Sequence, residues 1–327
     1  MRKPLLVTLP LLAMAALLTG CGSDIVTFDS KGQIGIEQRD LIILSFALML
    51  LVVIPAIFMT FWFGWKYRES NQEAEYRPNW SHSTKIEVVV WGVPCIIIAI
   101  LAWVTYVTCH SLDPFKKIES DKPALEVQVI AQPYKWTFIY PEEGIATVNE
   151  VYMPVNRPVT FSITSDFSMN AFHIPQLGGM IYAMAGMRSQ LNLIANEAGV
   201  FNGLSANYAG HGFSRMRFKA HAVSDEEYSA WVRQVKASAG KTLDPATYES
   251  LREYALQGVA EAHAADHHES LESAPVQYFP AVAPDLFKYV LDKYMAANHG
   301  DHAEHAKAEH AAHEANNAAA HAAAGGH

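Results

Sequence analysis

The stretch FNGLSANYAGHGFSRMRF, residues 201–218, closes a region of alternating apolar and polar residues and has the form of a metal-binding loop. Upstream, apolar side chains occupy every second position at 125–129, 159–163 and 191–193, and the alternation returns at 216–218. Such alternation is typical of half-buried antiparallel strands. Turns rich in Pro and Gly separate the segments, so about 110 residues are predicted to form one β-sandwich or barrel.

Five further runs carry a family resemblance. They are KGQIGIEQRDLII (31–43), NWSHSTKIE (79–87), FIYPEEGIATVNE (138–150), IYAMAGMRSQL (181–191) and APDLF (283–287). With these runs the sequence resembles subunit II of the cytochrome bo-type ubiquinol oxidases, which are haem–copper terminal oxidases. The resemblance implies a cupredoxin fold for the β region. It covers about residues 20–290, and the tail after Asn298 lies outside it.

The resemblance also assigns a lost copper site. In subunit II of cytochrome c oxidase, a relative of that family, a binuclear copper is held by cysteines, histidines and a methionine, which are soft ligands suited to copper. Met216 keeps its ligand position. The lost positions are Asn170, Ser205, Asn207, Ala209 and Phe213. Hydroxyl, methyl and phenyl groups do not hold copper, so we expect no metal and no cofactor in this chain.

The N-terminus has the pattern of a bacterial lipoprotein signal. Arg2 and Lys3 precede an apolar run at 5–18, and the small residues Thr19 and Gly20 lead to Cys21. In such signals residues 1–20 are removed and the cysteine thiol is acylated, commonly with palmitate. The alternative is an ordinary signal peptide with a chance cysteine. Lipidation at Cys21 is our prediction, since the cysteine falls at the cleavage point.

Two apolar segments are predicted to span the membrane. Residues 41–65 and 88–107 are each long enough for a hydrocarbon core of about 30 Å, and tryptophans lie towards their ends. If Cys21 is processed outside the cell membrane, then 21–40 is periplasmic, 66–87 is a cytoplasmic loop, and everything after about His110 is periplasmic. We therefore expect a multi-pass lipoprotein of the bacterial inner membrane.

The remaining chain divides into three parts. Residues 110–223 hold the cupredoxin-like domain. Residues 224–298 contain helix signals, including the capping pair Ser224 and Glu227 and a Pro after Asp244. The fold class is thus a membrane-anchored α+β protein, with a transmembrane hairpin, a periplasmic cupredoxin-like antiparallel β-sandwich or barrel, and C-terminal helices.

The tail at 299–327 is rich in Ala and His and is predicted to be disordered, because it has no large apolar side chain to bury. Seven of the 15 histidines lie there, and the pairs His302/His305 and His310/His313 have the spacing of a helical chelate. The alternative is a solvated tail with adventitious affinity for metals, which we favour because nothing fixes the ligands in space.

Histidines and aromatic residues near the lost copper site have alternative interpretations. His173 and His211 are more readily hydrogen-bonded or solvated than bound to a single copper ion. An odd offset from Asn170 along a strand turns His173 to the opposite face. Tyr134 and Trp136 correspond to an aromatic run that accepts electrons in the copper-bearing relatives. Without copper behind them, we expect core and interface roles for both.

Glu87 lies just before the second apolar segment. The resemblance implies that a glutamate here stands at the cytoplasmic mouth of a proton path into subunit I, and an acid at a membrane edge can collect protons. The alternative is an ordinary interfacial charge paired with Lys85 or with a lipid headgroup. The sequence leaves both interpretations open.

Composition limits the possible functions. The formal net charge of −9 argues against a nucleic-acid partner, and three cysteines are too few for a disulfide framework. The resemblance implies a non-catalytic subunit II of a proton-pumping ubiquinol oxidase, so the chain belongs to an enzyme without carrying a redox centre. Alternatives are subunit II of a cytochrome c oxidase or a free-standing copper-binding periplasmic lipoprotein.

The implied partners follow from that function. They are oxidase subunits I, III and IV and membrane lipid, with ubiquinol as the substrate of the complex and no cytochrome c. Haem and copper are expected in subunit I. The sequence does not specify the haem types, the quinone or the turnover.

Overall fold

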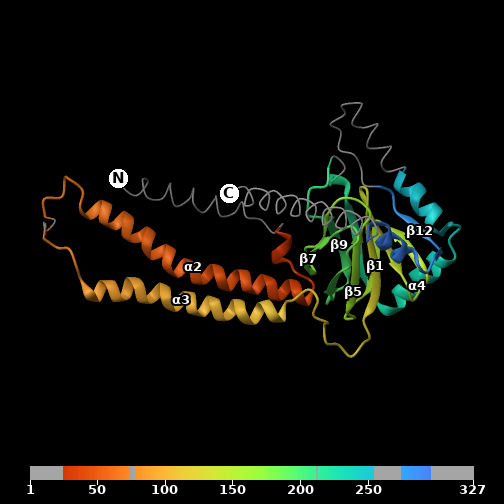
Figure 1. The fold of residues 1–327 in the computed structure, drawn as a ribbon. Helices are drawn as coiled ribbons and strands as arrows, with labels where there is room; N and C mark the ends of the chain where they lie inside the picture. Colours follow the sequence, from red (N-terminus) through yellow and green to blue (C-terminus); the bar gives the residue numbers. More distant parts are fainter. Residues whose placement is uncertain (1–24, 74, 76–78, 211–212, 254–273, 296–327) are drawn as a thin grey trace, which may run out of the picture.

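The computed structural model describes residues 25–73, 75, 79–210, 213–253 and 274–295. Two long helices, α2 (Gln33–Lys66) and α3 (Thr84–Ser111), run side by side away from a β domain (Figure 1). A short 3-10 helix, η1 (Val26–Phe28), precedes α2. The architecture is the helical hairpin and β-sandwich expected from the sequence.

The two helices are apolar along most of their length. Both are long and apolar enough to cross a bilayer, and their apolar side chains are exposed within the chain itself. Each contains a proline, Pro55 in α2 and Pro94 in α3. The helix α2 begins eight residues before the predicted span at Leu41, because its first two turns are polar and dock on the β domain.

The β domain is built from two facing sheets. The six-stranded sheet has the order β12-β3-β2-β1-β5-β8, and the five-stranded sheet has the order β4-β10-β9-β6-β7. The bounds are β1 Leu125–Gln132, β2 Lys135–Tyr140, β3 Ile145–Val148, β4 Glu150–Pro154, β5 Val159–Ser165, β6 Asn170–Ile174, β7 Gly178–Ala183, β8 Ser189–Leu193, β9 Gly199–Ser205, β10 Arg217–Val223 and β12 Gln277–Phe279.

Most strand pairs are antiparallel, as predicted, but β1 pairs with β5 and β4 pairs with β10 in parallel. The core between the sheets is aromatic. Phe172 stacks on Phe218 with ring centroids 5.1 Å apart, and Trp136 meets Phe172 edge-on at 5.4 Å. These large buried rings supply much of the apolar area that stabilises the domain.

A second, smaller core covers the outer face of the six-stranded sheet. Ile130, Ile139 and Val148 pack there against Tyr248 of a helix at 245–253 and Val290 of a helix at 286–295. Strand β2 is therefore buried at every position, although Lys135 and Thr137 alternate with Trp136 and Phe138 in its sequence. A small sheet of β11 (Thr242–Leu243) and β13 (Ala281–Val282) joins this layer.

The helix α4 (Asp225–Lys236) follows β10 and has the predicted cap. Ser224 accepts a hydrogen bond from the Glu227 amide, and the Glu227 carboxylate accepts one from the Ser224 amide. This capping box satisfies two amides that the first turn of a helix otherwise leaves unpaired. Trp231 and Val235 of α4 extend the main core.

The start of α2 is tied to the β domain by backbone hydrogen bonds. The amides of Lys31 and Gly35 donate to the carbonyls of Gln176 and Leu177 at 2.7 and 3.0 Å. A Cβ at Gly32 would lie 2.6 Å from the Leu177 carbonyl, and Gly178 has a φ of +116°. Both positions require glycine, so the helix meets β7 at a fixed, close junction.

Candidate functional site

Three of the positions that the family resemblance assigns to lost copper ligands come together in the fold. Asn170 begins β6 and Ser205 ends β9, a neighbouring strand of the same sheet. The Ser205 hydroxyl lies 3.3 Å from the Asn170 side-chain oxygen and 3.3 Å from the Asn207 carbonyl, and the Asn207 side chain donates to the Met169 carbonyl at 2.8 Å. We call Asn170, Ser205 and Asn207 the Asn170 cluster.

The rest of the loop closes onto the same strands. The Ser205 amide donates to the Met216 carbonyl at 2.9 Å, and the Met216 amide donates to the Phe213 carbonyl at 3.1 Å. Met216 is buried, and Trp136 donates its indole N–H to the Met216 carbonyl at 3.4 Å. Ala209 is also buried. Backbone hydrogen bonds and apolar contacts thus hold the loop.

The chemistry of these side chains does not suit copper. The Asn170 amide group donates to the Ser168 carbonyl at 2.8 Å, and Ser205 bonds within its own cluster. Asn170, Ser205 and Asn207 are neutral and offer hard oxygen donors, whereas copper in such sites takes thiolate and imidazole. Within the described residues, no three His, Cys, Asp or Glu side chains group as metal ligands.

His173 lies away from the Asn170 cluster. Phe172 pairs with Ser205 across the sheet, while His173 pairs with Leu204 and Met180, so its side chain points to the outer face as predicted. Burial lowers the pKa of His173, which favours the neutral imidazole. His211 lies outside the described residues.

Tyr134 and Trp136 lie in the core. Trp136 is fully buried among aromatic rings, and Tyr134, also buried, meets Phe167 edge-on with centroids 5.8 Å apart. Tyr134 has a positive φ of 60° at the turn between β1 and β2. The expected core role of both residues is confirmed.

Glu87 is in the first turn of α3 and its side chain is half exposed. Its carboxylate lies 2.6 Å from His82 Nδ1, rather than beside Lys85, and His82 Nε2 lies 3.1 Å from the Thr84 hydroxyl. A helix N-terminus favours an ionised carboxylate. Cys21 and the tail histidines lie outside the described residues.

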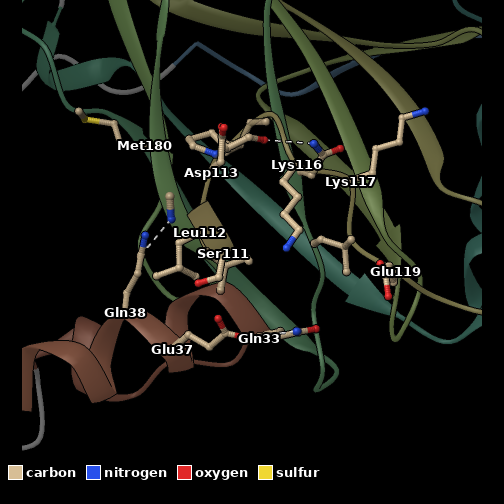
Figure 2. Close-up of a pocket in the computed structure, with 16 residues that line it drawn as sticks. Gln33, Glu37, Gln38, Ser111, Leu112, Asp113, Lys116, Lys117, Glu119 and Met180 are labelled. Carbon is tan, nitrogen blue, oxygen red and sulfur yellow. Dashed lines mark hydrogen bonds between the residues drawn. The ribbon is translucent and has the colours of Figure 1, made fainter. Parts of the chain in front are cut away.

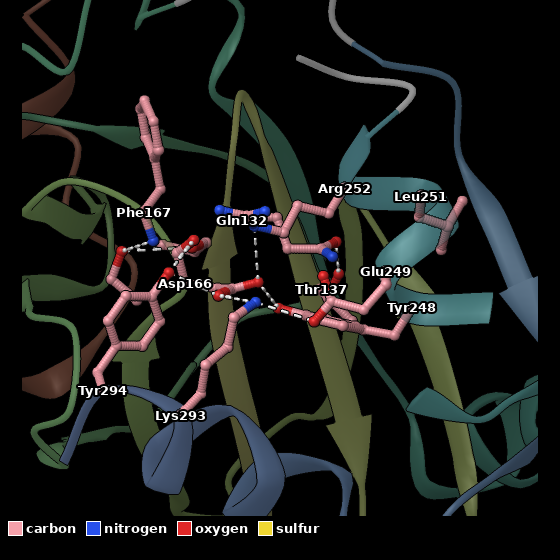
Figure 3. A network of polar contacts seen from close by, with 12 residues as sticks. Gln132, Thr137, Asp166, Phe167, Tyr248, Glu249, Leu251, Arg252, Lys293 and Tyr294 are labelled. Carbon is pink, nitrogen blue, oxygen red and sulfur yellow. Dashed lines mark hydrogen bonds and ion pairs between the residues drawn. The ribbon is translucent and has the colours of Figure 1, made fainter. Parts of the chain in front are cut away.

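Figure 3 shows in close-up a second polar group, which the sequence does not indicate. Asp166, immediately after β5, is fully buried. Its carboxylate accepts hydrogen bonds from the hydroxyls of Tyr248 and Tyr294, both at 2.9 Å. Lys293 Nζ lies 3.2 Å and Arg252 Nε 3.3 Å from it. We call these five residues the Asp166 cluster.

Charges within the Asp166 cluster are mutually compensated. Burial and the adjacent carboxylate raise the pKa of Tyr248 well above its ordinary value, so its proton stays on the phenol. Burial alone would lower the pKa of Lys293, but a hydrogen bond to Glu249 and the charge of Asp166 raise it. No local sequence motif predicts the cluster, because Tyr248 and Tyr294 lie 82 and 128 positions from Asp166 in the sequence.

Two family models and several known proteins match this chain. The family model "Cytochrome C oxidase subunit II, periplasmic domain" matches residues 126–223, and "COX Aromatic Rich Motif" matches 270–298. The chain is 51% identical over 300 residues to "Cytochrome bo(3) ubiquinol oxidase subunit 2" of Pseudomonas aeruginosa, covering 90% of this chain and 84% of that one. It is 50% identical over 286 residues to "Ubiquinol oxidase subunit 2" of Acetobacter aceti, covering 86% of each.

Among solved structures, the periplasmic domain of subunit II of cytochrome oxidase from Bradyrhizobium japonicum aligns with a TM-score of 0.34 at 22% identity. That alignment covers 36% of this chain and 96% of the other.

Proposed function

The chain belongs to the subunit 2 family of the ubiquinol oxidases, and from this premise we propose that it is the redox-free second subunit of a proton-pumping, haem–copper terminal oxidase. The complex oxidises ubiquinol and reduces dioxygen to water. The two helices hold the chain in the membrane with the β domain outside. Subunit I, which would carry the haems and copper, is the proposed main partner, together with subunits III and IV.

The Asn170 cluster is the single observation that carries the redox-free role. Neutral side chains occupy the positions where a copper relay would be held, and hydrogen bonds join them to one another and to the backbone. A quinol donor reaches the complex through the lipid, so it needs no periplasmic copper relay. The same observation disfavours the alternative of a cytochrome c oxidase subunit.

The test is the composition and activity of the purified complex. A tag on this chain should isolate a haem-containing membrane complex that oxidises ubiquinol. Copper per haem should be unchanged when the tail after Asn298 is removed or when Ser205 is replaced by alanine. Purification of this chain without haem would favour a free-standing lipoprotein. Loss of one or two copper ions per complex in Ser205→Ala would overturn the redox-free role.

Glu87 is proposed to feed protons into subunit I from the cytoplasmic surface. Its half-exposed carboxylate at the start of α3, hydrogen-bonded to His82, supports capture of protons from water. Glu87→Gln keeps the shape and removes the charge, so the complex should assemble with reduced turnover. The loss should deepen as pH rises and protons become scarce, and Glu87→Asp should be milder.

The measurement for Glu87 is quinol-oxidase turnover against pH in the assembled complex. Glu69→Gln, in the same loop, is the matched control and should leave the profile unchanged. Full activity of Glu87→Gln across the alkaline range would make Glu87 an ordinary surface charge.

Lipidation of Cys21 is proposed as a further attachment to the inner membrane. The sequence before Cys21 supports it. Mass spectrometry of the mature chain should find a start at Cys21 with added acyl mass. A chain that begins elsewhere or carries no acyl group would contradict it. Cys21→Ser should remain membrane-bound, because the two helices bind the bilayer more strongly than acyl chains do.

A further inference from the structure

A cavity of about 480 Å³ lies where the helical hairpin meets the β domain (Figure 2). Its walls come from the first turns of α2, the segment that follows α3, and strands β7 and β8. This volume is within the range of about 300–1,000 Å³ that small-molecule sites occupy. The lining side chains that matter below are Gln33, Glu37, Asp113, Lys116, Lys117 and Glu119.

The cavity lies at the level of lipid headgroups. The apolar part of α2 begins at Leu41 and α3 ends at Ser111, so the cavity is just outside the apolar part of the hairpin. The polar headgroup region adds roughly 5–8 Å on each side of a hydrocarbon core of about 30 Å. Glu37 precedes Leu41 by four residues, or about 6 Å of helix, so the part of the α2 wall that carries Glu37 falls within that region.

The charges around the cavity have both signs. Lys116 and Lys117 supply two positive charges, and Glu37, Asp113 and Glu119 supply three negative charges, which leaves a formal charge of −1. Figure 2 shows the Lys116 side chain directed towards the α2 wall, where Gln33 donates to Glu37 at 3.3 Å. This arrangement disfavours a purely anionic ligand and suits a zwitterion.

An apolar groove continues from the cavity towards the membrane interior. It has a volume of about 280 Å³ and is lined mainly by apolar surface between α2 and α3, including Leu41 and Leu44. Glu37 and Leu112 line both the cavity and the groove. A ligand with a polar head and an apolar chain could occupy both spaces at once.

Hydrogen bonds hold the backbone of two walls in place before any ligand arrives. Gly35 donates its amide to the Leu177 carbonyl at 3.0 Å, and Gln38 accepts a hydrogen bond from the Gly179 amide at 3.2 Å. The segment after α3 is held to β8 because Asn192 donates its side-chain amide to the Pro114 carbonyl at 3.1 Å. A backbone that is already held loses little conformational freedom on binding.

We propose that this cavity binds the headgroup of a zwitterionic phospholipid with a primary ammonium, such as phosphatidylethanolamine. Its phosphate pairs with Lys116, its ammonium pairs with Glu37, and one acyl chain follows the groove past Leu41. The proposal rests on the membrane orientation given under the proposed function. The bound lipid would fill the junction between the membrane hairpin and the β domain.

The test uses the full chain purified in detergent, with thermal unfolding and native mass spectrometry as measurements. Phosphatidylethanolamine should raise the Tm more than phosphatidylglycerol at equal concentration, and inorganic phosphate should have no effect. One phosphatidylethanolamine should remain bound in the wild type and be lost in Lys116→Glu. Lys219→Glu is the matched control. Lys219 of β10 donates a hydrogen bond to Asn202 of β9, and neither strand lines the cavity.

Conservative variants guard against misfolding. Lys116→Met and Glu37→Gln should each weaken retention of the lipid while the oxidase complex still assembles. An equal Tm rise with free phosphate would make this a small-anion site and overturn the lipid proposal. If all three cavity variants retain the lipid, the lipid proposal is wrong. That conclusion holds whether or not the variants assemble with the haem subunit. In each case the proposed function would be judged separately, by haem co-purification.

Discussion

The Asn170 cluster and the Asp166 cluster lie at the two ends of one five-residue segment, yet they use opposite chemistry. The Asn170 cluster is neutral and bonds mainly to backbone atoms of its own β domain. The Asp166 cluster is ionic, with a fully buried carboxylate between two cations and two phenols. Its partners come from the two helices of the outer layer.

The contrast between neutral and ionic side chains indicates that the two clusters have different structural roles. The Asn170 cluster fills positions that the family resemblance assigns to lost copper ligands, and neutral hydrogen bonds join its side chains. The Asp166 cluster joins segments far apart in the chain, so it specifies how the C-terminal helices pack. A buried charge needs all its partners, since removal of one leaves an uncompensated charge in a low-dielectric site. The Asp166 cluster should therefore be much more sensitive to substitution.

Asp166→Asn should have the largest effect. It removes the negative charge between Lys293 and Arg252 and should lower the free energy of unfolding by about 3 kcal/mol. Thermal unfolding of the full chain in detergent, followed by near-ultraviolet circular dichroism, measures it. Glu143→Gln is the control, because its exposed ion pair with Lys236 contributes at most about 1 kcal/mol. Equal losses in both variants would contradict the contrast between the clusters.

Lys135→Met tests a buried cation beside the outer layer. The Lys135 ammonium is buried and bonds to the Leu251 carbonyl at 2.7 Å, and burial lowers its pKa from 10.5 to about 8. Between pH 8 and 10.5 the unfolded chain therefore binds more protons, so this group makes stability rise with pH. Between pH 8 and pH 9.5 the free energy of unfolding of the wild type should therefore rise by up to about 2 kcal/mol relative to that of Lys135→Met.

The measurement for Lys135 is chemical unfolding at several pH values up to 9.5, which is below the ordinary pKa of tyrosine of about 10. Lys122→Met is the control, because Lys122 is exposed and pairs with Asp225. If the free energies of unfolding of the wild type and of Lys135→Met change with pH in parallel, the buried ammonium does not cause the rise in stability.

Tyr248→Phe removes one hydrogen bond to Asp166 and leaves the charges in place. A hydrogen bond to a charged group contributes about 1.5–3 kcal/mol. Since three partners of Asp166 remain in the variant, we expect the free energy of unfolding to fall by about 1.5 kcal/mol, the lower figure. Hydrogen exchange should speed up in the helix at 245–253. Tyr208→Phe, at an exposed tyrosine, should change nothing measurable.

Ser205→Ala should have the smallest effect. It removes hydroxyl contacts of 3.3–3.4 Å within a neutral site, which corresponds to about 1 kcal/mol of unfolding free energy. The Tm of the full chain is the measurement, and Ser214→Ala at the exposed neighbouring position is the control. A loss as large as that of Asp166→Asn would remove the distinction between the two clusters.

The sequence by itself determined the helical hairpin, the β-sandwich and the cap of α4. These features depend on local patterns: apolar runs long enough for a bilayer, period-two alternation and a capping pair. Such patterns act over a few residues, so they can be read directly from the chain. The orientation of His173 away from Asn170 followed from the same strand geometry.

Only the tertiary structure decided the outer layer, the Asp166 cluster and the cavity at the hairpin junction. Strand β2 is fully buried, because the C-terminal helices cover its second face. Asp166 meets Tyr248 and Tyr294 across 82 and 128 positions. Contacts between distant segments depend on how whole elements pack, and no local sequence pattern encodes that packing.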